Sequence, residues 1–385
     1  MKVKPTILIF IDWYLPGYKA GGPIQSCANL VEHLKEEANF YIVTRNTDYC
    51  SDKPYSSVTS DEWNEQNGAQ VYYISRYQLN IQTLRRLLKG VDPDTIYING
   101  VYSLFFSILP VLLAKKLNNK HVVIAARGMF AGSAINVKGL KKKMFFGLAK
   151  ITNLYKGVTF HATNSAEEGD IKAVLGHVTP VHVAPNLSEV LVDTPALPEK
   201  RLKARGEVKL VSIARISPEK NTKYALEVLR EYKGQEKVKL DLFGPVYNKE
   251  YWEECCAVIE EMPANVSVDY KGSLEKEKVH QVLQQNHALF MPTKGENFGH
   301  IILESLTAGC PVIISDQTPW KKLEAAGVGY DLSLKNKDGF KDAIQFLAGL
   351  DQERYDNLSD KAVAYAQTYI QNSSNVEANK ALFNL

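Results

Sequence analysis

The chain has 385 residues, of which 45% are hydrophobic, and carries a formal net charge of +3. This length suits two domains with sizeable cores, and this composition excludes a disordered chain. So small a positive excess does not favour a nucleic-acid-binding protein. The five cysteines form no C-x-x-C pair and the histidines form no H-E-x-x-H. We therefore expect a reducing compartment, no disulfide framework and no bound metal ion.

Membrane-crossing and secretory segments are not expected. The apolar run Ile7–Ile11 is shorter than the core of a signal peptide. The longest apolar stretch, Val101–Ala114, falls short of the roughly 18 residues that a spanning helix needs. We expect a protein that stays in the cytoplasm and contacts a membrane, if at all, from the inner face of the cytoplasmic membrane.

Short apolar runs alternate with amphipathic stretches in the first half of the chain. The helix predicted at Pro23–Glu36 has proline at its first turn and apolar residues at helical spacing. Runs without strict alternation are typical of strands that are covered on both faces. The strands predicted in this half are Ile7–Ile11, Phe40–Thr44, Val71–Ile74, Thr95–Asn99, His121–Ala126, Val158–Ala162 and Val181–Ala184.

A second strand–helix series follows a proline-containing, charged stretch. Its predicted strands are Val208–Ala214, Lys237–Phe243, Val266–Tyr270, Ala288–Pro292 and Pro311–Ser315, with helices between them. We predict an α/β protein of two Rossmann-like, doubly wound parallel-sheet domains facing across a cleft. The expected boundaries are 1–186, a linker at 187–207, and 208–385, with the final helix a candidate to pack back on the first domain.

The segment Lys294–Glu304 follows a predicted strand and opens a helix near Gly299. A helix N-terminus offers free N–H groups and the positive end of the helix dipole, which suits a diphosphate. Glu296 and Glu304 are placed to accept hydrogen bonds from sugar and ribose hydroxyls. The alternative is a pair of surface glutamates at a helix start.

A second strand–turn–helix segment, Ala214–Asn221, holds Arg215 and Lys220. Two fixed cations at the carboxyl end of a strand can neutralise a diphosphate and stabilise the charge that grows on it as it leaves. Taken alone, the segment is equally compatible with ordinary solvated charges.

Together the two segments resemble glycosyltransferase family 4, which has the GT-B fold. The E-x7-E of Glu296 and Glu304, within G-E-N-F-G-H-I-I-L-E-S, matches the family's sugar-donor motif, and the R-x4-K of Arg215 and Lys220 matches its diphosphate-binding pair. The resemblance implies a retaining transferase that uses a nucleotide-diphosphate sugar and no metal ion. It implies catalytic roles for Arg215, Lys220 and Glu296, and a ribose contact for Glu304. It also places Asn297, Phe298, Gly299, His300 and Ile301 near the sugar and phosphates, and Gly272, Ser273 and Leu274 near the base.

The glycine-containing loop after the first strand is less specific. Gly17 and Gly22 have the spacing of P-loop glycines, but Pro23 stands where the lysine belongs, and no G-x-G-x-x-G occurs. A P-loop is therefore rejected, and a Rossmann oxidoreductase is disfavoured. In the family resembled, a Gly-Gly loop here closes over the phosphate of the sugar donor, and Gly21 and Gly22 match it. A plain strand-to-helix turn stays open as the alternative.

Three polar residues at predicted strand ends of the first domain are candidates for acceptor or phosphate binding. Arg127 stands where many family members carry histidine, and it cannot act as a base because guanidinium stays protonated. His161 is expected to be structural rather than catalytic, and Asn99 ends the Thr95 strand.

The stretch Lys138–Lys156 mixes lysines with large apolar residues. It fits either a helix lying on an anionic membrane or a helix packed on the core with solvated lysines. The function expected is sugar transfer to a glycan or lipid-linked acceptor in surface polysaccharide or glycolipid assembly. A transferase with a soluble product on the same fold, or a non-catalytic sugar-nucleotide sensor or scaffold, is the alternative.

Overall fold

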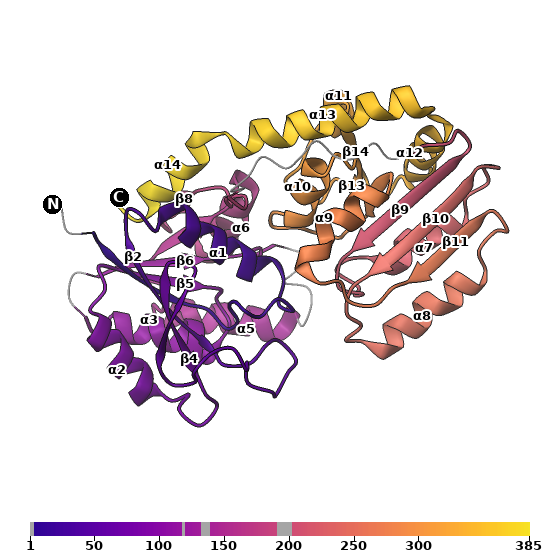
Figure 1. Ribbon diagram of the computed structural model, residues 1–385. Coiled ribbons are helices and arrows are strands. Elements are labelled where there is room, and N and C mark those ends of the chain that lie inside the picture. The colour runs from indigo at the N-terminus through magenta and orange to yellow at the C-terminus, as the bar shows by residue number, and fades with distance from the viewer. Residues whose placement is uncertain (1–3, 118–119, 132–138, 191–201) are drawn as a thin grey trace. The chain divides into compact units, whose positions relative to one another are not determined.

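A computed structural model describes residues 4–117, 120–131, 139–190 and 202–385 (Figure 1). The chain divides into two compact units. The first comprises Met1–Val190 with Asn372–Leu385, and the second comprises Leu191–Gln371. The sequence expectation placed the linker at 187–207, and residues 191–201 of it lie outside the described residues.

The first unit is built on an eight-stranded sheet in the order β3-β4-β2-β1-β5-β6-β7-β8. Among the described strands, β3 alone runs antiparallel to its neighbour, and the other pairs are parallel. The strands are β1 (Thr6–Phe10), β2 (Asn39–Arg45), β3 (Trp63–Gln66), β4 (Ala69–Ile74), β5 (Thr95–Asn99), β6 (His121–Ala125), β7 (Thr159–Ala162) and β8 (Val181–Val183).

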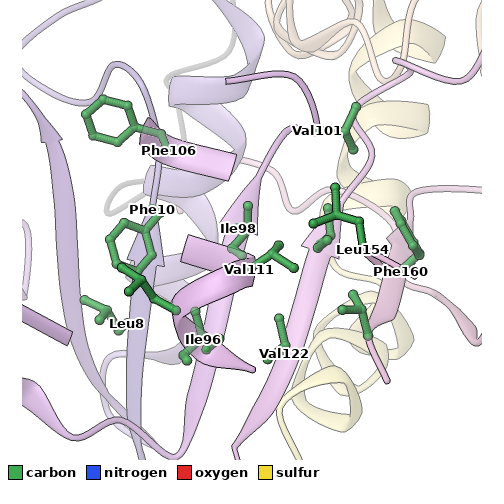
Figure 2. Packing of buried hydrophobic residues seen from close by; sticks show 14 of the residues in the cluster. Leu8, Phe10, Ile96, Ile98, Val101, Phe106, Val111, Val122, Leu154 and Phe160 are labelled. Atoms are coloured by element: carbon green, nitrogen blue, oxygen red, sulfur yellow. The ribbon is translucent and has the colours of Figure 1, made fainter. Parts of the chain in front are cut away.

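Helices cover both faces of this sheet, so its central strands β1 and β5 are apolar on both sides, whereas the edge strand β3 is polar. One face packs on α1 (Gly22–Leu34) and α14 (Ser373–Leu382). The other, part of which Figure 2 shows, packs on the remaining helices. Among them are α2 (Ile81–Val91), the π-helical turn η1 (Leu104–Ile108), α3 (Leu109–Ala114), α5 (Gly139–Ile151) and α6 (Ser165–Leu175).

The second unit holds six parallel strands in the order β11-β10-β9-β12-β13-β14. The strands are β9 (Glu207–Ile213), β10 (Lys237–Phe243), β11 (Val266–Tyr270), β12 (Ala288–Met291), β13 (Val312–Ser315) and β14 (Gly329–Leu332). The helices are α7 (Thr222–Arg230), α8 (Lys249–Glu260), α9 (Lys276–Gln285), α10 (His300–Thr307), α11 (Leu323–Ala326), α12 (Lys337–Gly349) and α13 (Gln352–Ile370).

This second sheet also has a core on each face. One core joins α7, α8 and α12 to the sheet, and the other joins α9, α10 and α13. Alternate residues of β10, namely Val238, Leu240 and Leu242, point to the same face and are all buried in the first of these cores. The doubly wound arrangement brings the carboxyl ends of all six strands to one edge of the sheet.

The expected α/β class and every predicted strand are confirmed, within a residue or two at the ends. Strands β3 and β14 were missed. The sequence of β3 is Trp-Asn-Glu-Gln and that of β14 is Gly-Tyr-Asp-Leu, so neither edge strand contains a continuous apolar run. Within the described part of the chain, no helix combines the length and apolar character needed to cross a bilayer.

Candidate functional site

The carboxyl edge of the second sheet gathers the two motif-bearing loops. The loop after β9 is joined to the loop after β12 by backbone and side-chain hydrogen bonds. Lys294 N donates to the Glu219 carbonyl at 3.0 Å, and Thr293 Oγ1 donates to the same oxygen at 3.1 Å. Asn221 Nδ2 donates to the Pro292 carbonyl at 3.0 Å. The two loops therefore form one fixed surface rather than two independent turns.

The loop after β10 braces the same surface through a close backbone approach. Gly244 has φ +143°, and a Cβ built on it would lie 1.8 Å from the Ala214 carbonyl oxygen. Ala214 N donates to the Phe243 carbonyl at 3.0 Å, and Gly244 N donates to the Gly272 carbonyl at 2.8 Å. Only glycine fits at this position. Through Gly244, the loop that begins at Arg215 is connected to the predicted base-binding segment Gly272–Leu274.

Lys220 and Glu296 form an ion pair that joins the two motifs across 76 positions of the sequence. Their side chains are 21% and 10% exposed, so the pair is largely withdrawn from water yet still reachable. Because both groups are partly desolvated, their attraction is stronger than that of a surface pair. The cation predicted for the diphosphate and the carboxylate predicted for the sugar therefore lie in direct contact.

Glu219 is a member of this cluster that the sequence analysis did not single out. Burial acts to raise the pKa of its carboxyl group, but hydrogen bonds from its own backbone N–H and from Ser217, together with neighbouring positive charges, lower it overall. These positive charges are those of Arg215 and Lys294. Its position directly before Lys220 was the available signal. The site thus sets Glu219 and Glu296 against the cations Arg215, Lys220 and Lys294.

The N-terminus of α10 lies beside this charge cluster. Gly299 caps the helix at φ 78°, and a Cβ there would lie 2.7 Å from Ile302 Cδ1. Glu296 N is held by the Gln317 carbonyl at 3.0 Å. Asn297, His300 and Ile301 are partly exposed at the helix start, and Glu304 is partly exposed one turn further on. Diphosphate binding at this helix N-terminus stays a prediction.

Phe298 anchors the loop before α10 by packing in the core. Its ring lies 5.5 Å from that of Trp320, which lies 4.9 Å from that of Tyr369. Trp320 Nε1 donates to the Phe298 carbonyl at 2.6 Å. Phe298 is 6% exposed, so its ring offers little surface to a ligand. Trp320 was missed because its loop, after β13, carries no recognisable motif.

Arg127 of the first unit lies in a network of neutral acceptors. Its Nε donates to Asn99 Oδ1 at 3.0 Å, its Nη1 to Asn186 Oδ1 at 2.5 Å, and its Nη2 to the Tyr97 hydroxyl at 3.1 Å. Arg127 also has a positive φ of 51°. The guanidinium thus ties together the ends of β5, β6 and β8.

His161 ends the same chain of hydrogen bonds. Its Nε2 lies 2.7 Å from the Ala184 carbonyl, which only accepts, so Nε2 carries the proton and Nδ1 accepts from the Tyr97 hydroxyl at 2.8 Å. Burial, helped by the charge of Arg127, lowers the pKa of His161 to about 3. The imidazole is 2% exposed and neutral, so it presents nothing to a ligand.

The Gly21–Gly22 loop follows β1 at the carboxyl edge of the first sheet. Asp48 holds the residues before it, accepting from Tyr18 N and Lys19 N at 3.2 Å each. Gly21 has φ 75° and precedes α1, which begins at Gly22. Asp48 therefore fixes the residues before the loop within the first unit, and the phosphate contact that the resemblance implies for Gly21 and Gly22 stays a prediction.

Residues 193–365 match the family model of the group 1 glycosyl transferases. No curated protein matches the chain. Among solved structures, HepE of Anabaena in complex with UDP and glucose shares 14% identity over 98% of both chains, with a TM-score of 0.70. The sucrose-phosphate synthase of Thermosynechococcus elongatus shares 14% identity over 99% of this chain and 98% of its own, with a TM-score of 0.70. WaaG, a glycosyltransferase involved in lipopolysaccharide biosynthesis, shares 12% identity over 98% of this chain and 99% of its own, with a TM-score of 0.62. At such identities the likeness establishes the fold, which is GT-B.

Proposed function

We propose that this chain, whose residues 193–365 match the family model of the group 1 glycosyl transferases, moves a sugar from a nucleotide-diphosphate sugar to a hydroxyl group of a glycan or lipid-linked acceptor. The observation that carries the proposal is the contact between Lys220 and Glu296, with Arg215 on the same loop as Lys220. That contact supports the proposal because Lys220 is the cation proposed to bind the diphosphate and Glu296 is the group proposed to accept hydrogen bonds from sugar hydroxyls.

In this proposal Arg215 and Lys220 bind the diphosphate. The bond between the sugar's anomeric carbon and the phosphate oxygen breaks, and its electron pair leaves with the diphosphate. A bond from the acceptor oxygen to that carbon forms, and the proton of the acceptor hydroxyl passes to the leaving diphosphate. Negative charge on the leaving diphosphate peaks as the first bond breaks, so fixed cations stabilise the transition state more than the bound sugar donor. Glu296 orients the transferred sugar, Glu304 accepts from the ribose, and the N–H groups at the start of α10 face the phosphates.

We also propose net retention of anomeric configuration and no requirement for a metal ion, as the family resemblance implies. The three cations at the site, Arg215, Lys220 and Lys294, already supply positive charge. Nuclear magnetic resonance of the first product formed tests retention. Activity that persists in a chelator supports metal independence, and strict dependence on magnesium or manganese contradicts it.

A sugar-nucleotide sensor on the same fold is the competing function. The measurement that separates the two is release of nucleoside diphosphate from a panel of sugar nucleotides, with and without acceptor. Uridine diphosphate sugars come first, because HepE structures hold UDP and UDP-glucose. An enzyme releases diphosphate slowly without acceptor and faster with it. Binding without release, for every member of the panel, supports the sensor.

The acceptor is proposed to be lipid-linked, with the enzyme working on the cytoplasmic face of the membrane. Helix α5 carries exposed Met144, Leu148 and Ile151, which are 67%, 60% and 80% exposed, while Phe146 and Ala149 on its other side are buried in the core. An apolar stripe at this helical spacing, left in water, fits insertion into a lipid interface.

Basic side chains accompany the stripe. Lys150 is exposed on α5, and Lys142 lies over the Tyr102 ring, 5.2 Å from its centroid. Lys138 and the side chains of Lys141 and Lys143 lie outside the described residues. Near an anionic surface each lysine contributes about 1 kcal/mol, and the attraction weakens as salt rises.

Sedimentation with anionic and neutral vesicles tests this attachment. Leu148→Ser with Ile151→Ser, and Lys142→Gln with Lys150→Gln, should each reduce binding to anionic vesicles. The exposed Val178→Ser variant, from a loop outside α5, is the control. Equal lack of binding to both vesicle types rejects membrane attachment. Transfer to a soluble sugar with none to a lipid-linked one rejects the lipid-linked acceptor.

A further inference from the structure

A cluster of polar and aromatic side chains lies where the winding of the first sheet reverses. Helix α1, which follows β1, packs on one face of the sheet, whereas η1 and α3, which follow β5, pack on the other. Strands β1 and β5 are neighbours, so the chain leaves their carboxyl ends in opposite directions. In open α/β sheets this reversal opens the crevice in which ligands bind.

A carboxylate bridges that reversal. Asp12 follows β1, Ser103 follows β5, and Ser103 Oγ donates to Asp12 Oδ1 at 2.9 Å. Arg45, the last residue of β2, donates from Nη2 to the same oxygen at 3.2 Å. The Asp12 and Arg45 side chains are 19% and 33% exposed, so both keep contact with solvent. Burial raises the pKa of Asp12, which Ser103 and Arg45 partly oppose.

Aromatic rings surround the guanidinium of Arg45. Its carbon lies 5.0 Å from the centroid of the Phe106 ring and 5.7 Å from that of the Trp13 ring. Trp13 meets Tyr49 edge to face at 4.9 Å. Phe106 is fully buried in the core and labelled in Figure 2, whereas Trp13 and Tyr49 are partly exposed. Stacking holds the guanidinium plane, and Trp13 presents apolar ring surface beside it.

This cluster retains unused hydrogen-bonding capacity. Among the described residues, Asp12 Oδ2 and Arg45 Nη1 have no hydrogen-bond partner. A carboxylate oxygen accepts from hydroxyl groups, a guanidinium N–H donates to them, and an indole face packs against the C–H face of a sugar ring. The arrangement therefore matches an uncharged ring that carries several hydroxyl groups.

Charge argues against a phosphate ligand at this place. Asp12 neutralises Arg45 and would repel a diphosphate, whereas Arg215, Lys220 and Lys294 of the second unit supply an excess of positive charge around Glu219 and Glu296. The Arg127 network of the first unit is an unsuitable alternative, because Asn99, Asn186 and Tyr97 already occupy both terminal nitrogens and Nε of its guanidinium.

We propose that Asp12, Trp13 and Arg45 bind the sugar ring of the acceptor and set its specificity. Asp12 accepts from the ring's hydroxyls, Arg45 donates to them, and Trp13 packs on the ring. This inference rests on the proposed sugar transfer and identifies the acceptor as a neutral sugar unit at its reactive end.

The experiment compares steady-state kinetics of full-length variants with the best acceptor found for the wild type. Asp12→Asn and Trp13→Ala should each raise the KM for the acceptor by about 10- to 100-fold, the loss expected for a charge-assisted hydrogen bond or a stacked ring. The KM for the sugar nucleotide should change by less than about twofold. Trp13→Phe, which keeps an aromatic ring, should lie between wild type and Trp13→Ala.

Matched controls come from exposed positions of the same unit. Asp52→Asn and Trp63→Phe make the same chemical changes on the loop after β2 and on edge strand β3, and should leave the acceptor KM unchanged. An unchanged acceptor KM in Trp13→Ala and Asp12→Asn, or equal rises in the KM of acceptor and sugar nucleotide, would overturn the inference. Failure of the proposed function is a different result, namely a wild type that transfers no sugar.

Discussion

The two sheets each present arginine at the carboxyl end of a strand, but they use it differently. Arg127 follows β6 and donates to three neutral oxygens, on Asn99, Asn186 and Tyr97. Arg215 follows β9 in a loop where Glu219 and Glu296 supply carboxylates and Lys220 and Lys294 supply more positive charge. Each nitrogen of the first guanidinium donates to a group that stays in place, whereas the cations of the second sheet are balanced by groups that a diphosphate can replace.

This difference separates a bracing cation from a ligand-binding one. Neutral acceptors bond Arg127 without cancelling its charge, and removing the arginine would take one hydrogen-bond donor from each of three buried side chains. A carboxylate that pairs with Lys220 cancels charge and competes with an anionic ligand for the same N–H groups. Position after a strand is therefore insufficient to assign function, and the partners of each cation decide it.

The largest expected effect is on turnover. Lys220→Ala and Arg215→Ala should each lower kcat by about 100- to 1000-fold, because each removes a donor to the charge that develops on the leaving diphosphate. Lys223→Ala, one residue into α7 and paired with Glu254 at the surface, is the control and should retain turnover. Steady-state kinetics showing only a raised KM would assign the two cations to ground-state binding instead.

Replacing Arg127 should lower the stability of the first unit and leave binding of the sugar donor unchanged. Arg127→Ala should lower the free energy of unfolding of the first unit by about 2–4 kcal/mol, because Asn99, Asn186 and Tyr97 lose a shared partner. Hydrogen exchange of the β6 and β7 amides measures this loss, and Arg127→Lys should recover only part of it. Unchanged protection in Arg127→Ala would remove the bracing role.

His161 gives the same network a pH dependence. Its pKa of about 3 in the folded chain lies below the ordinary value of 6.5, so between these values the unfolded chain binds a proton that the folded chain does not. This stabilisation is fully present above pH 6.5 and is lost as pH falls, by up to about 1.4 kcal/mol per pH unit. The measurement is the hydrogen-exchange protection of the β6 and β7 amides as a function of pH. In His161→Gln the part of this pH dependence that comes from His161 should disappear. An identical slope in both proteins would contradict the buried neutral histidine.

The smallest expected effect is that of Glu296→Gln on affinity for nucleoside diphosphate, and here the substitution should strengthen binding rather than weaken it. In Glu296→Gln, Lys220 loses its carboxylate competitor, so nucleoside diphosphate without sugar should bind about three- to tenfold more tightly. Turnover should fall in the same variant, because the sugar loses an acceptor for its hydroxyls. Titration calorimetry of the diphosphate gives the first quantity, and weaker binding in Glu296→Gln would show that the ion pair does not compete with the ligand.

The sequence predicted the fold well because strands covered on both faces are continuous apolar runs, and glycines and prolines mark their ends. The local strand–turn–helix pattern also placed Arg215, Lys220 and Glu296 at one sheet edge, since parallel strands share that edge. Glu219 and Trp320 were missed because their contacts connect segments about 20 to 75 positions apart. Asp12, Arg45 and Ser103 meet only through the strand order β2-β1-β5, which the sequence analysis did not assign.

The most direct test of the account is the affinity of the full-length chain for nucleoside diphosphate, measured by titration calorimetry in the wild type, the Arg215→Ala/Lys220→Ala double variant and Arg127→Ala. The account predicts that the double variant binds at least about tenfold more weakly, while Arg127→Ala binds like the wild type at a temperature at which it remains folded. Unchanged affinity in the double variant, or an equal loss in Arg127→Ala, would contradict the assignment of the diphosphate to the carboxyl edge of the second sheet.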